Sequence, residues 1–360
     1  MKRDYGGVKM DFIELQKQLN TILKKSHVDS KLDYCLCCGK KVSSFCNSHS
    51  LPKFVLKNIS SDGYVLTSNN YFKMPLVNIT EGLKKSGTFK RICNECDNSL
   101  FTSYESSEQL LSYPRKKMMT QIDLKNALRM YDKRLNEIAL YNNIFSMDPN
   151  YFIQCQLFER QKINYLDLKE IKNEVQNDLE ILSKTSPSSF ELIFWEKLNY
   201  VTPIAFQGHI ALVGDLKGSV INNIYNENEN YVIENINICV FPLQKETIVM
   251  MFINRGYKKY KNFINQFKKL TKEKKLQLIS YIIFHYSEDF FISKNAKDEI
   301  LSNQNLDIVT QNVTNILALD EEMGNQIKKV KFNELMDYIN FPNILGEQYS
   351  ILEKEVISND

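Results

Sequence analysis

The sequence contains no run of about 18 apolar residues, which is the length that a membrane-spanning helix needs, so we expect no membrane span. Its start, MKRDYGGVKMDF, has no apolar core of the kind found in secretory signal peptides. It also has no P-loop, no G-x-G-x-x-G and no internal repeat, the common signatures of nucleotide binding and of repeat proteins. We therefore expect a cytoplasmic protein whose cysteines are reduced thiols.

Histidine is scarce, with 4 in 360 residues, and the 8 cysteines are unevenly placed. Four of them lie between Cys35 and Cys46, in CLCCGKKVSSFC, and His49 follows in NSHSLPKF. In a protein with reduced thiols, so many potential ligands in a short stretch favour a metal site over disulfides.

A second pair of cysteines completes this pattern. Cys93 and Cys96, in RICNECDNSLF, repeat the C-x-x-C spacing of Cys35 and Cys38. Two such pairs suit a tetrahedral zinc site, because each pair can span one edge of the tetrahedron. The 54 residues between the pairs exceed the spacer of a small zinc finger, so they must fold into structure of their own. We predict structural zinc bound by these four cysteines.

Four cysteines lie outside the two pairs. Cys37 and Cys46 could each replace a cysteine of the first pair as a ligand. Cys155 and Cys239 lie in the apolar stretches FIQCQLF and INICVFPL, so we expect them to be buried core thiols.

Charge is distributed unevenly along the chain, although its net value is only +3. Residues 1–120 carry 19 Lys/Arg and 11 Asp/Glu, whereas residues 121–360 carry 27 and 32. A basic first third suggests contact with an anion such as nucleic acid, and ordinary surface lysine is the alternative. Zinc bound by thiolates would offset part of this positive charge.

Local patterns place the cysteine pairs on a compact plan. Gly39 predicts a turn after the first pair, and Pro52 predicts the start of the helix PKFVLKNI. Residues 61–91 alternate and turn, which predicts strands. A helical pattern follows the second pair directly. A zinc knuckle, strands, a second knuckle and a helix make up the plan of a treble-clef zinc domain.

Residues 30–110 resemble the HNH endonucleases, which are ββα-metal nucleases that carry a structural zinc. In that family one C-x-x-C precedes the catalytic histidine, and a metal-binding residue directly follows the second. The matching residues here are Cys35, Cys38, His49, Cys93, Cys96 and Asp97. The stretches SHSLPKFVLKNI and CNECDNSLFTSYE are also similar to a recurring bacterial variant, often found in proteins suspected of phage defence.

The resemblance implies a metal-dependent endonuclease that hydrolyses phosphodiester bonds, with DNA favoured over RNA. It assigns His49 as the general base and Asp97 as a ligand of catalytic Mg²⁺ or Mn²⁺, and both residue types suit these roles. Asn98 and Glu105, further along the predicted helix, are additional catalytic candidates. The candidate phosphate contacts are Lys53, Lys57, Lys90 and Arg91. A homo-oligomer or an activating partner protein is left open.

Two positions depart from the pattern of the family. Ser48 stands where members often carry Asp or Glu, and Asp97 stands in place of the usual final histidine. His49 could instead be a zinc ligand or a turn residue, Asp97 a helix cap, and Glu105 a solvated helix residue. The alternative function is a non-catalytic zinc module that binds nucleic acid or a partner protein.

The remaining segments predict an α+β protein with four parts. Residues 1–30 form an amphipathic helix, 31–117 an HNH-like zinc domain, 118–187 a helical connector, and 188–360 an α+β domain. PRKKMM, which begins at Pro114, is expected to be a linker or a phosphate contact before a long helix that starts near Ile122. The last part contains five predicted strands in a mainly antiparallel sheet, then two helices and a helical tail. The strands are ELIFWEKL, PIAFQ, HIALVGD, YVIENINICVFPL and ETIVMMFIN, and the last two are expected to form a hairpin around residues 244–246. We expect this last part to sense, regulate or assemble.

One stretch of this last part, QGHIALVGDLKGSVINN, holds His209, Asp215 and Asn222. These residues lie near glycines and could form a functional site. A simple strand-turn-strand is the alternative.

Overall fold

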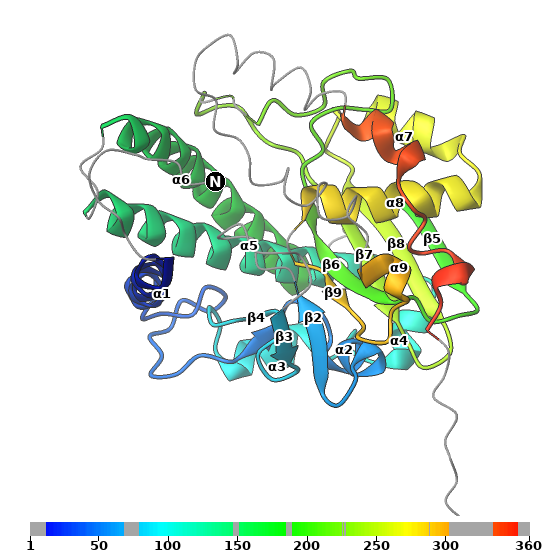
Figure 1. Ribbon diagram of the computed structural model, residues 1–360, viewed down its shortest axis with the longest axis horizontal. Coiled ribbons are helices and arrows are strands. Elements are labelled where there is room, and N and C mark those ends of the chain that lie inside the picture. Colours follow the sequence, from blue (N-terminus) through cyan, green and yellow to red (C-terminus); the bar gives the residue numbers. More distant parts are fainter. Residues whose placement is uncertain are drawn as a thin grey trace, which may run out of the picture.

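A computed structural model describes residues 12–67, 79–146, 151–184, 189–224, 226, 228–287, 289–301 and 334–351 (Figure 1). They form an α+β fold with long helices and an antiparallel sheet, which confirms the coarse prediction of the fold class. Within these residues, no helix combines the length and the apolar character needed to cross a membrane.

The first third of the chain contains mostly short elements. In order they are α1 (Phe12–Asp29), β1 (Ser48–His49), α2 (Lys53–Ile59), β2 (Tyr64–Thr67), β3 (Ile79–Gly82), β4 (Thr88–Phe89), α3 (Asn94–Phe101) and α4 (Ser107–Leu111). The predicted helix after Pro52 and the predicted strands within residues 61–91 are confirmed.

Longer elements make up the rest of the chain. They are α5 (Lys116–Phe145), α6 (Tyr151–Ser183), β5 (Phe190–Leu198), β6 (Ile204–Ile210), β7 (Ile236–Pro242), β8 (Thr247–Asn254), α7 (Lys261–Lys268), α8 (Lys272–Tyr286), β9 (Phe291–Ile292) and α9 (Asp298–Leu301). Two 3₁₀ turns, Glu334–Asn340 and Glu347–Tyr349, follow.

Helix α5 begins earlier than the sequence indicated. The expected start was near Ile122, with PRKKMM as a linker, but the helix starts at Lys116 directly after an extended Arg115. Met118 and Met119 are buried in the core, so apolar packing stabilises this additional turn and a half of helix. The segment is therefore part of the helix and not a linker.

Among the described residues, the sheet has seven strands in the order β3-β2-β9-β6-β7-β8-β5, and its neighbouring strands are antiparallel. The sequence predicted separate strands at PIAFQ and HIALVGD, but residues 204–210 form the single strand β6. On both sides of Gly208 the side chains of this strand alternate between the two faces of the sheet, so the glycine does not interrupt the strand. The predicted hairpin between β7 and β8 is confirmed, and the Leu243 amide donates to the Glu246 carbonyl at 2.7 Å.

Both faces of the sheet are covered by helices. Alternate residues such as Phe206 and Ile238 point into a core shared with α7 and α8. The intervening residues, such as Ala205 and Cys239, point into a second core that contains α2 and α5. Figure 1 shows α8 across one side of the sheet and α2, α3 and α4 on the other. The burial of Cys239 matches its prediction, whereas the side chain of Cys155 lies outside the described residues.

Segments far apart in the sequence meet in this sheet. Strand β2 pairs with β9 through Leu66 and Ile292, and β9 pairs with β6 through Ile292 and Ile204. Main-chain pairing therefore crosses the boundaries predicted at residues 117 and 188. The division into four domains stays a prediction.

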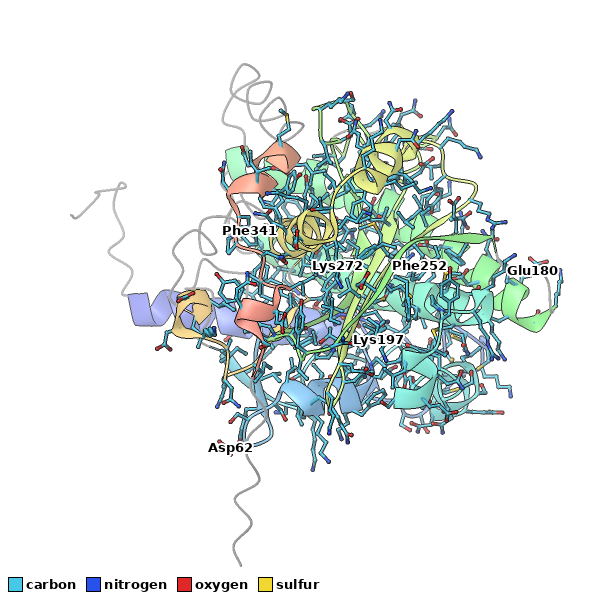
Figure 2. All side chains as sticks on the ribbon, turned by 90° about the vertical axis from the view of Figure 1, so that its right-hand side faces the viewer. Asp62, Glu180, Lys197, Phe252, Lys272 and Phe341 are labelled. Atoms are coloured by element: carbon cyan, nitrogen blue, oxygen red, sulfur yellow. The ribbon has the colours of Figure 1, made fainter. Side chains whose placement is uncertain are left out.

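Helix α1 packs on α5, which also pairs with α6. The amide of Asn143 donates to the Ser26 hydroxyl at 3.1 Å, and Arg134 Nε donates to Asp167 at 3.0 Å. The view in Figure 2 shows Phe252 inside the molecule, whereas Asp62, before β2, and Glu180, near the end of α6, lie at its periphery.

Ion pairs between partly buried side chains hold the segment just before β9 against the long helix. The Asp289 carboxylate accepts from Arg129 Nη2 at 2.8 Å and from Lys133 Nζ at 3.2 Å, and both bases lie on α5. Burial by itself would raise the pKa of Asp289, but the two neighbouring cations hold it well below its usual range. This carboxylate is therefore charged in the fold at any ordinary pH.

We predict that Asp289→Asn lowers the free energy of unfolding by on the order of 2 kcal/mol at neutral pH, a value between those of exposed and buried pairs, because two partly buried cations each lose one carboxylate partner while Arg129 keeps Asp132. The folded-state pKa of Asp289 lies below its unfolded value, so its stabilisation is present above the unfolded pKa and is lost as the pH falls. Urea denaturation should therefore show a shallower loss of stability between about pH 5 and pH 2 for the variant than for the wild type.

Glu299→Gln, which removes an exposed carboxylate from the nearby helix α9, is the control and should leave both quantities unchanged. Equal acid sensitivity of the wild type and Asp289→Asn would contradict the prediction.

Candidate functional site

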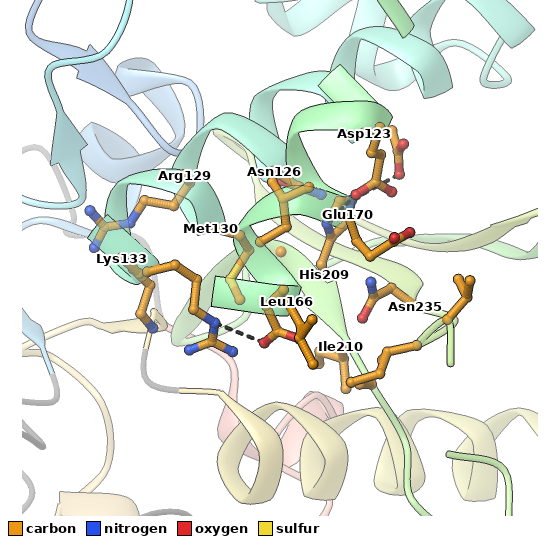
Figure 3. Close-up of a pocket in the computed structure, with 18 of the residues that line it drawn as sticks. Asp123, Asn126, Arg129, Met130, Lys133, Leu166, Glu170, His209, Ile210 and Asn235 are labelled. Carbon is orange, nitrogen blue, oxygen red and sulfur yellow. Dashed lines mark hydrogen bonds and ion pairs between the residues drawn. The ribbon is translucent and has the colours of Figure 1, made fainter. Parts of the chain in front are cut away.

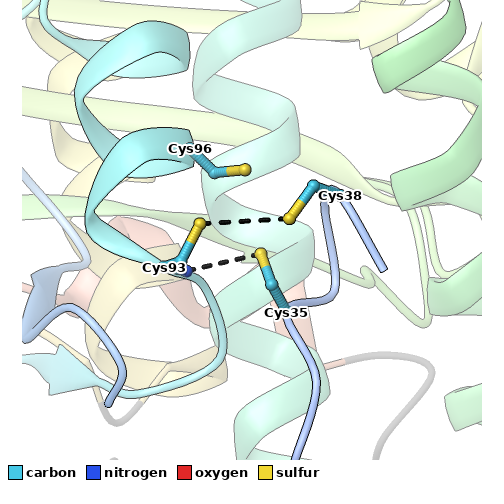
Figure 4. A group of neighbouring side chains, drawn as sticks. All are labelled: Cys35, Cys38, Cys93 and Cys96. Carbon is cyan, nitrogen blue, oxygen red and sulfur yellow. Dashed lines mark hydrogen bonds between the residues drawn. The ribbon is translucent and has the colours of Figure 1, made fainter. Parts of the chain in front are cut away.

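Four cysteines from two distant segments lie together (Figure 4). Cys35 and Cys38 belong to the loop before β1, while Cys93 caps the N-terminus of α3 and Cys96 lies in its first turn. Their sulfur atoms all lie within 4.8 Å of one another. These are the four cysteines whose spacing predicted a metal site.

The arrangement fits a tetrahedral ion. Cys38 Sγ and Cys93 Sγ are 4.0 Å apart, and two ligands of a tetrahedral zinc with bonds of about 2.3 Å are separated by about 3.8 Å. The Cys93 amide donates to Cys35 Sγ at 3.3 Å, and Gly39 adopts a φ of 68° in the turn after Cys38. The four cysteines could therefore hold a metal ion such as zinc.

The electrostatics of these thiols differ strongly. A hydrogen bond with the Cys37 thiol, together with backbone amides, lowers the pKa of Cys35 to about 3. Burial raises the pKa of Cys96 above its usual range. Cys37 and Cys46, the alternative ligands, lie outside the group of four. Cys46 instead donates its thiol to Asp97 Oδ2 at 3.4 Å.

His49 lies on the short strand β1, which follows the first cysteine pair in the sequence. This strand pairs with β4 through His49 and Thr88, and α3 follows β4. The Nε2 atom lies 3.0 Å from the Leu83 carbonyl, which can only accept a hydrogen bond, so Nε2 carries the proton. Burial lowers the pKa of His49 below 6.5. The neutral imidazole therefore presents Nδ1 as the nitrogen that can take up a proton.

Asp97 faces the residue that precedes His49. The Ser48 hydroxyl donates to Asp97 Oδ1 at 2.5 Å, which is a short hydrogen bond to a carboxylate. Ser48 is buried and Asp97 is half-buried. The two side chains come from β1 and α3, so this contact fixes the strand against the first turns of the helix.

The sequence patterns did not identify Lys125 on α5, which also lies beside Asp97. Its side chain is 2% exposed, and the ammonium group forms an ion pair with Glu105 and lies 4.0 Å from Asp97 Oδ1. It also lies over the ring of Phe101, 4.3 Å from the centroid. Its position in the helix could have indicated burial. Lys125 is three residues from both Ile122 and Leu128, so it lies on an apolar stripe of the helix.

Glu105 reaches Asp97 by a different route from the one expected. The sequence placed Glu105 on the same predicted helix as Asp97, but α3 ends at Phe101. Glu105 lies in the following turn and meets Asp97 only through the shared Lys125. Asn98 is exposed on α3.

The candidate phosphate contacts divide into two groups. Lys53, Lys57 and Lys90 are exposed. Arg91 is 4% exposed, pairs with Asp132 at 2.7 Å and donates to the Ser30 carbonyl at 2.7 Å. The prediction that Arg91 binds phosphate is therefore wrong, because its guanidinium group joins the loop before α3 to α5.

A second group of ionisable residues lies on the far side of α5, in a cavity of about 1080 Å³ between α5, α6 and β6 (Figure 3). Asp123, Glu174 and His209 converge there. Burial raises the pKa of Glu174 to about 8. Burial opposes the charged form of His209, but Glu174 and Asp123 raise its pKa to about 9.

Of the three residues in the predicted strand-turn-strand stretch, only His209 enters this group. Asp215 Oδ1 accepts from the amides of Lys217 and Ser219 at 2.8 and 2.9 Å, so it stabilises a turn. Asn222 donates to the Leu212 carbonyl at 2.9 Å and supports the same loop.

No protein-family model, no curated protein and no solved structure matches this chain. The resemblance to HNH endonucleases therefore stays a prediction.

We predict that the purified protein contains one zinc ion per chain and that Cys93→Ser loses it. The loss should strongly destabilise the fold around α3, because structural zinc contributes on the order of 10 kcal/mol to folding in small zinc fingers. Elemental analysis and thermal unfolding measure the two effects.

Cys37→Ser is the matched control, since Cys37 lies beside the group but is not one of its four members. It should retain zinc. A wild type without metal, or a Cys93→Ser protein that keeps its zinc, would contradict this prediction.

Proposed function

We propose that this protein is a metal-dependent endonuclease of the HNH type, built on a treble-clef domain with zinc at the four cysteines. The observation that carries the proposal is the 2.5 Å hydrogen bond between Ser48 and Asp97. These are the two positions at which the family often carries metal ligands. Their side chains come from different elements and meet beside His49.

The order of elements also supports the proposal. Strands β1 and β4 are antiparallel neighbours, and α3 follows β4 directly, which gives a strand-strand-helix unit. Its first strand carries His49 and its helix carries Asp97. Helix α2 and strands β2 and β3 are inserted between β1 and β4, which accounts for the long spacer between the cysteine pairs.

The chemistry of phosphodiester hydrolysis assigns a role to each of these residues. His49 Nδ1 would accept the proton of the attacking water, because the Leu83 carbonyl holds the proton on Nε2. Asp97 would hold a divalent ion such as Mg²⁺ or Mn²⁺, whose charge stabilises the phosphate and the leaving oxygen. A carboxylate suits a hard cation of this kind.

Lys125 is a positioning residue in this scheme. Its ammonium group is too buried to reach a substrate, but it lies between the carboxylates of Asp97 and Glu105 and fixes both. The four cysteines restrain the start of α3, so Asp97 is held in place from two sides. Rigid support of this kind is what a catalytic site needs.

The substrate we propose is nucleic acid, with DNA favoured over RNA. Lys53, Lys57 and Lys90 remain available for phosphates because their side chains are exposed. Lys84 and Lys85, in the turn beside Leu83, add two exposed bases near His49.

A non-catalytic zinc module that binds nucleic acid or a partner protein is the second candidate. Two observations favour it. Ser48 supplies a hydroxyl where the family often has a carboxylate, and the Lys125 ammonium already balances part of the negative charge of Asp97 and Glu105.

The test is plasmid cleavage by zinc-loaded protein in the presence of Mg²⁺ or Mn²⁺. His49→Ala and Asp97→Asn should each reduce the cleavage rate by at least about 100-fold, the lower range for loss of a general base. Both variants should keep their zinc and remain folded, because in Asp97→Asn the Lys125 ammonium keeps its ion pair with Glu105. The matched controls are His27→Ala, in α1, and Glu95→Gln, which removes an exposed carboxylate from α3.

Loss of zinc from His49→Ala would make His49 a scaffold ligand and remove the base from the proposal. If the wild type does not cleave with either metal, Ser48→Asp provides the deciding comparison. New cleavage by Ser48→Asp would assign the natural protein to the non-catalytic class.

A further inference from the structure

Three elements bring ligand-type side chains together in the cavity beside α5. Asp123 comes from α5, Glu174 from α6 and His209 from β6, and one ligand atom of each lies within 4.8 Å of the others. His209 Nε2 is 2.8 Å from Asp123 Oδ1, and His209 Nδ1 is 3.9 Å from Glu174 Oε2. In Figure 3, His209 points toward Asp123.

Buried amides orient the carboxylate of Asp123. The side chain of Asn237 donates to Asp123 Oδ1 at 2.5 Å. Asn126 donates to Asn237 at 2.7 Å, and Gln207 donates to Asn126 at 3.0 Å. Each of these side chains is at most 3% exposed. A chain of this kind fixes a ligand in the way that outer hydrogen bonds do around metal ions.

A separate observation points to a missing partner. Asp178 follows Glu174 by one turn of α6, is 3% exposed and lines the same cavity. Among the described residues, no donor reaches its Oδ2 atom, and the side chain lies beside the carboxylate of Asp123, so the two carboxyl groups need either a shared proton or a cation between them. A buried carboxylate oxygen without a donor is unfavourable, so this atom is suited to a cation.

Three of the bases that line the cavity are ion-paired with other carboxylates of its wall. Arg129 and Lys133 pair with Asp289, and Arg134 pairs with Asp167. The carboxylates of Asp123, Glu174 and Asp178 gather on the other side of the cavity, around one imidazole. Carboxylates and an imidazole together suit a divalent first-row metal ion such as Mn²⁺.

We propose that Asp123, Glu174 and His209, with Asp178 as a fourth ligand, bind a divalent metal ion in this cavity. The ion would lie at the wall of a space of about 1080 Å³, so a small molecule could reach it. This site shares no residue with the group around Asp97 and does not depend on the proposed nuclease activity.

The experiment uses full-length, zinc-loaded Asp97→Asn protein, in which the other proposed Mn²⁺ site is removed. Mn²⁺ is titrated and the free ion is followed by electron paramagnetic resonance. We expect one Mn²⁺ per chain to bind saturably. Adding Glu174→Gln or His209→Gln should weaken binding at least about tenfold, which corresponds to roughly 1.4 kcal/mol.

The matched control is Glu180→Gln, which removes the same charge from the same helix at an exposed position, and it should leave binding unchanged. A thermal shift keeps the test decisive if a variant is less stable, because Mn²⁺ should raise the melting temperature of the parent and not of the two ligand variants.

Absence of saturable binding below about 1 mM Mn²⁺, or equal binding by parent and ligand variants, would overturn the proposal. Bound protons, and not a metal ion, would then balance the carboxyl groups of Asp123, Glu174 and Asp178. Neither outcome tests the proposed nuclease activity, which is measured separately as plasmid cleavage by the wild type and by His49→Ala.

Discussion

Buried charge on α5 is the constraint on which the rest of the structure depends. This helix lies against the sheet, yet it carries Asp123, Lys125 and Arg129 on or near its buried faces. An unpaired charge in such a place costs far more than a hydrogen bond contributes, so each must find a partner from another element. Lys125 meets Asp97 and Glu105 from the cysteine-rich segment, and Asp123 meets His209 from the sheet.

The same helix therefore supports two separate groups of candidate functional residues. Asp123 and Lys125 are two positions apart, which places them on different sides of a helix. One side faces β1 and α3, and the other faces α6 and the cavity. Beside the first group, the Cys93 amide donates to Cys35 Sγ and joins the start of α3 to the loop before β1. The amides of Asn126 and Asn237 secure the second.

The sheet explains why the first third of the chain cannot be treated separately from the last. Strand β9 lies between β2 and β6, and it pairs with both. Arg129 and Lys133 hold Asp289, next to this strand, against α5. The cysteine-rich segment, the long helix and the sheet thus share main-chain hydrogen bonds, ion pairs and one hydrophobic core.

The sequence by itself determined what depends on local spacing. The two C-x-x-C pairs, the helix after Pro52 and the α+β class follow from residue order and periodicity over short stretches. Tertiary structure decided the partners of single charged residues. Lys125 occupies an apolar stripe, and only the packing of α5 shows that it bridges Asp97 and Glu105. Arg91 had the charge of a phosphate contact, but burial against Asp132 gave it a structural role. The group around His209 joins side chains from three elements, and no spacing within one segment encodes such a meeting, because long-range contacts arise only when the elements pack.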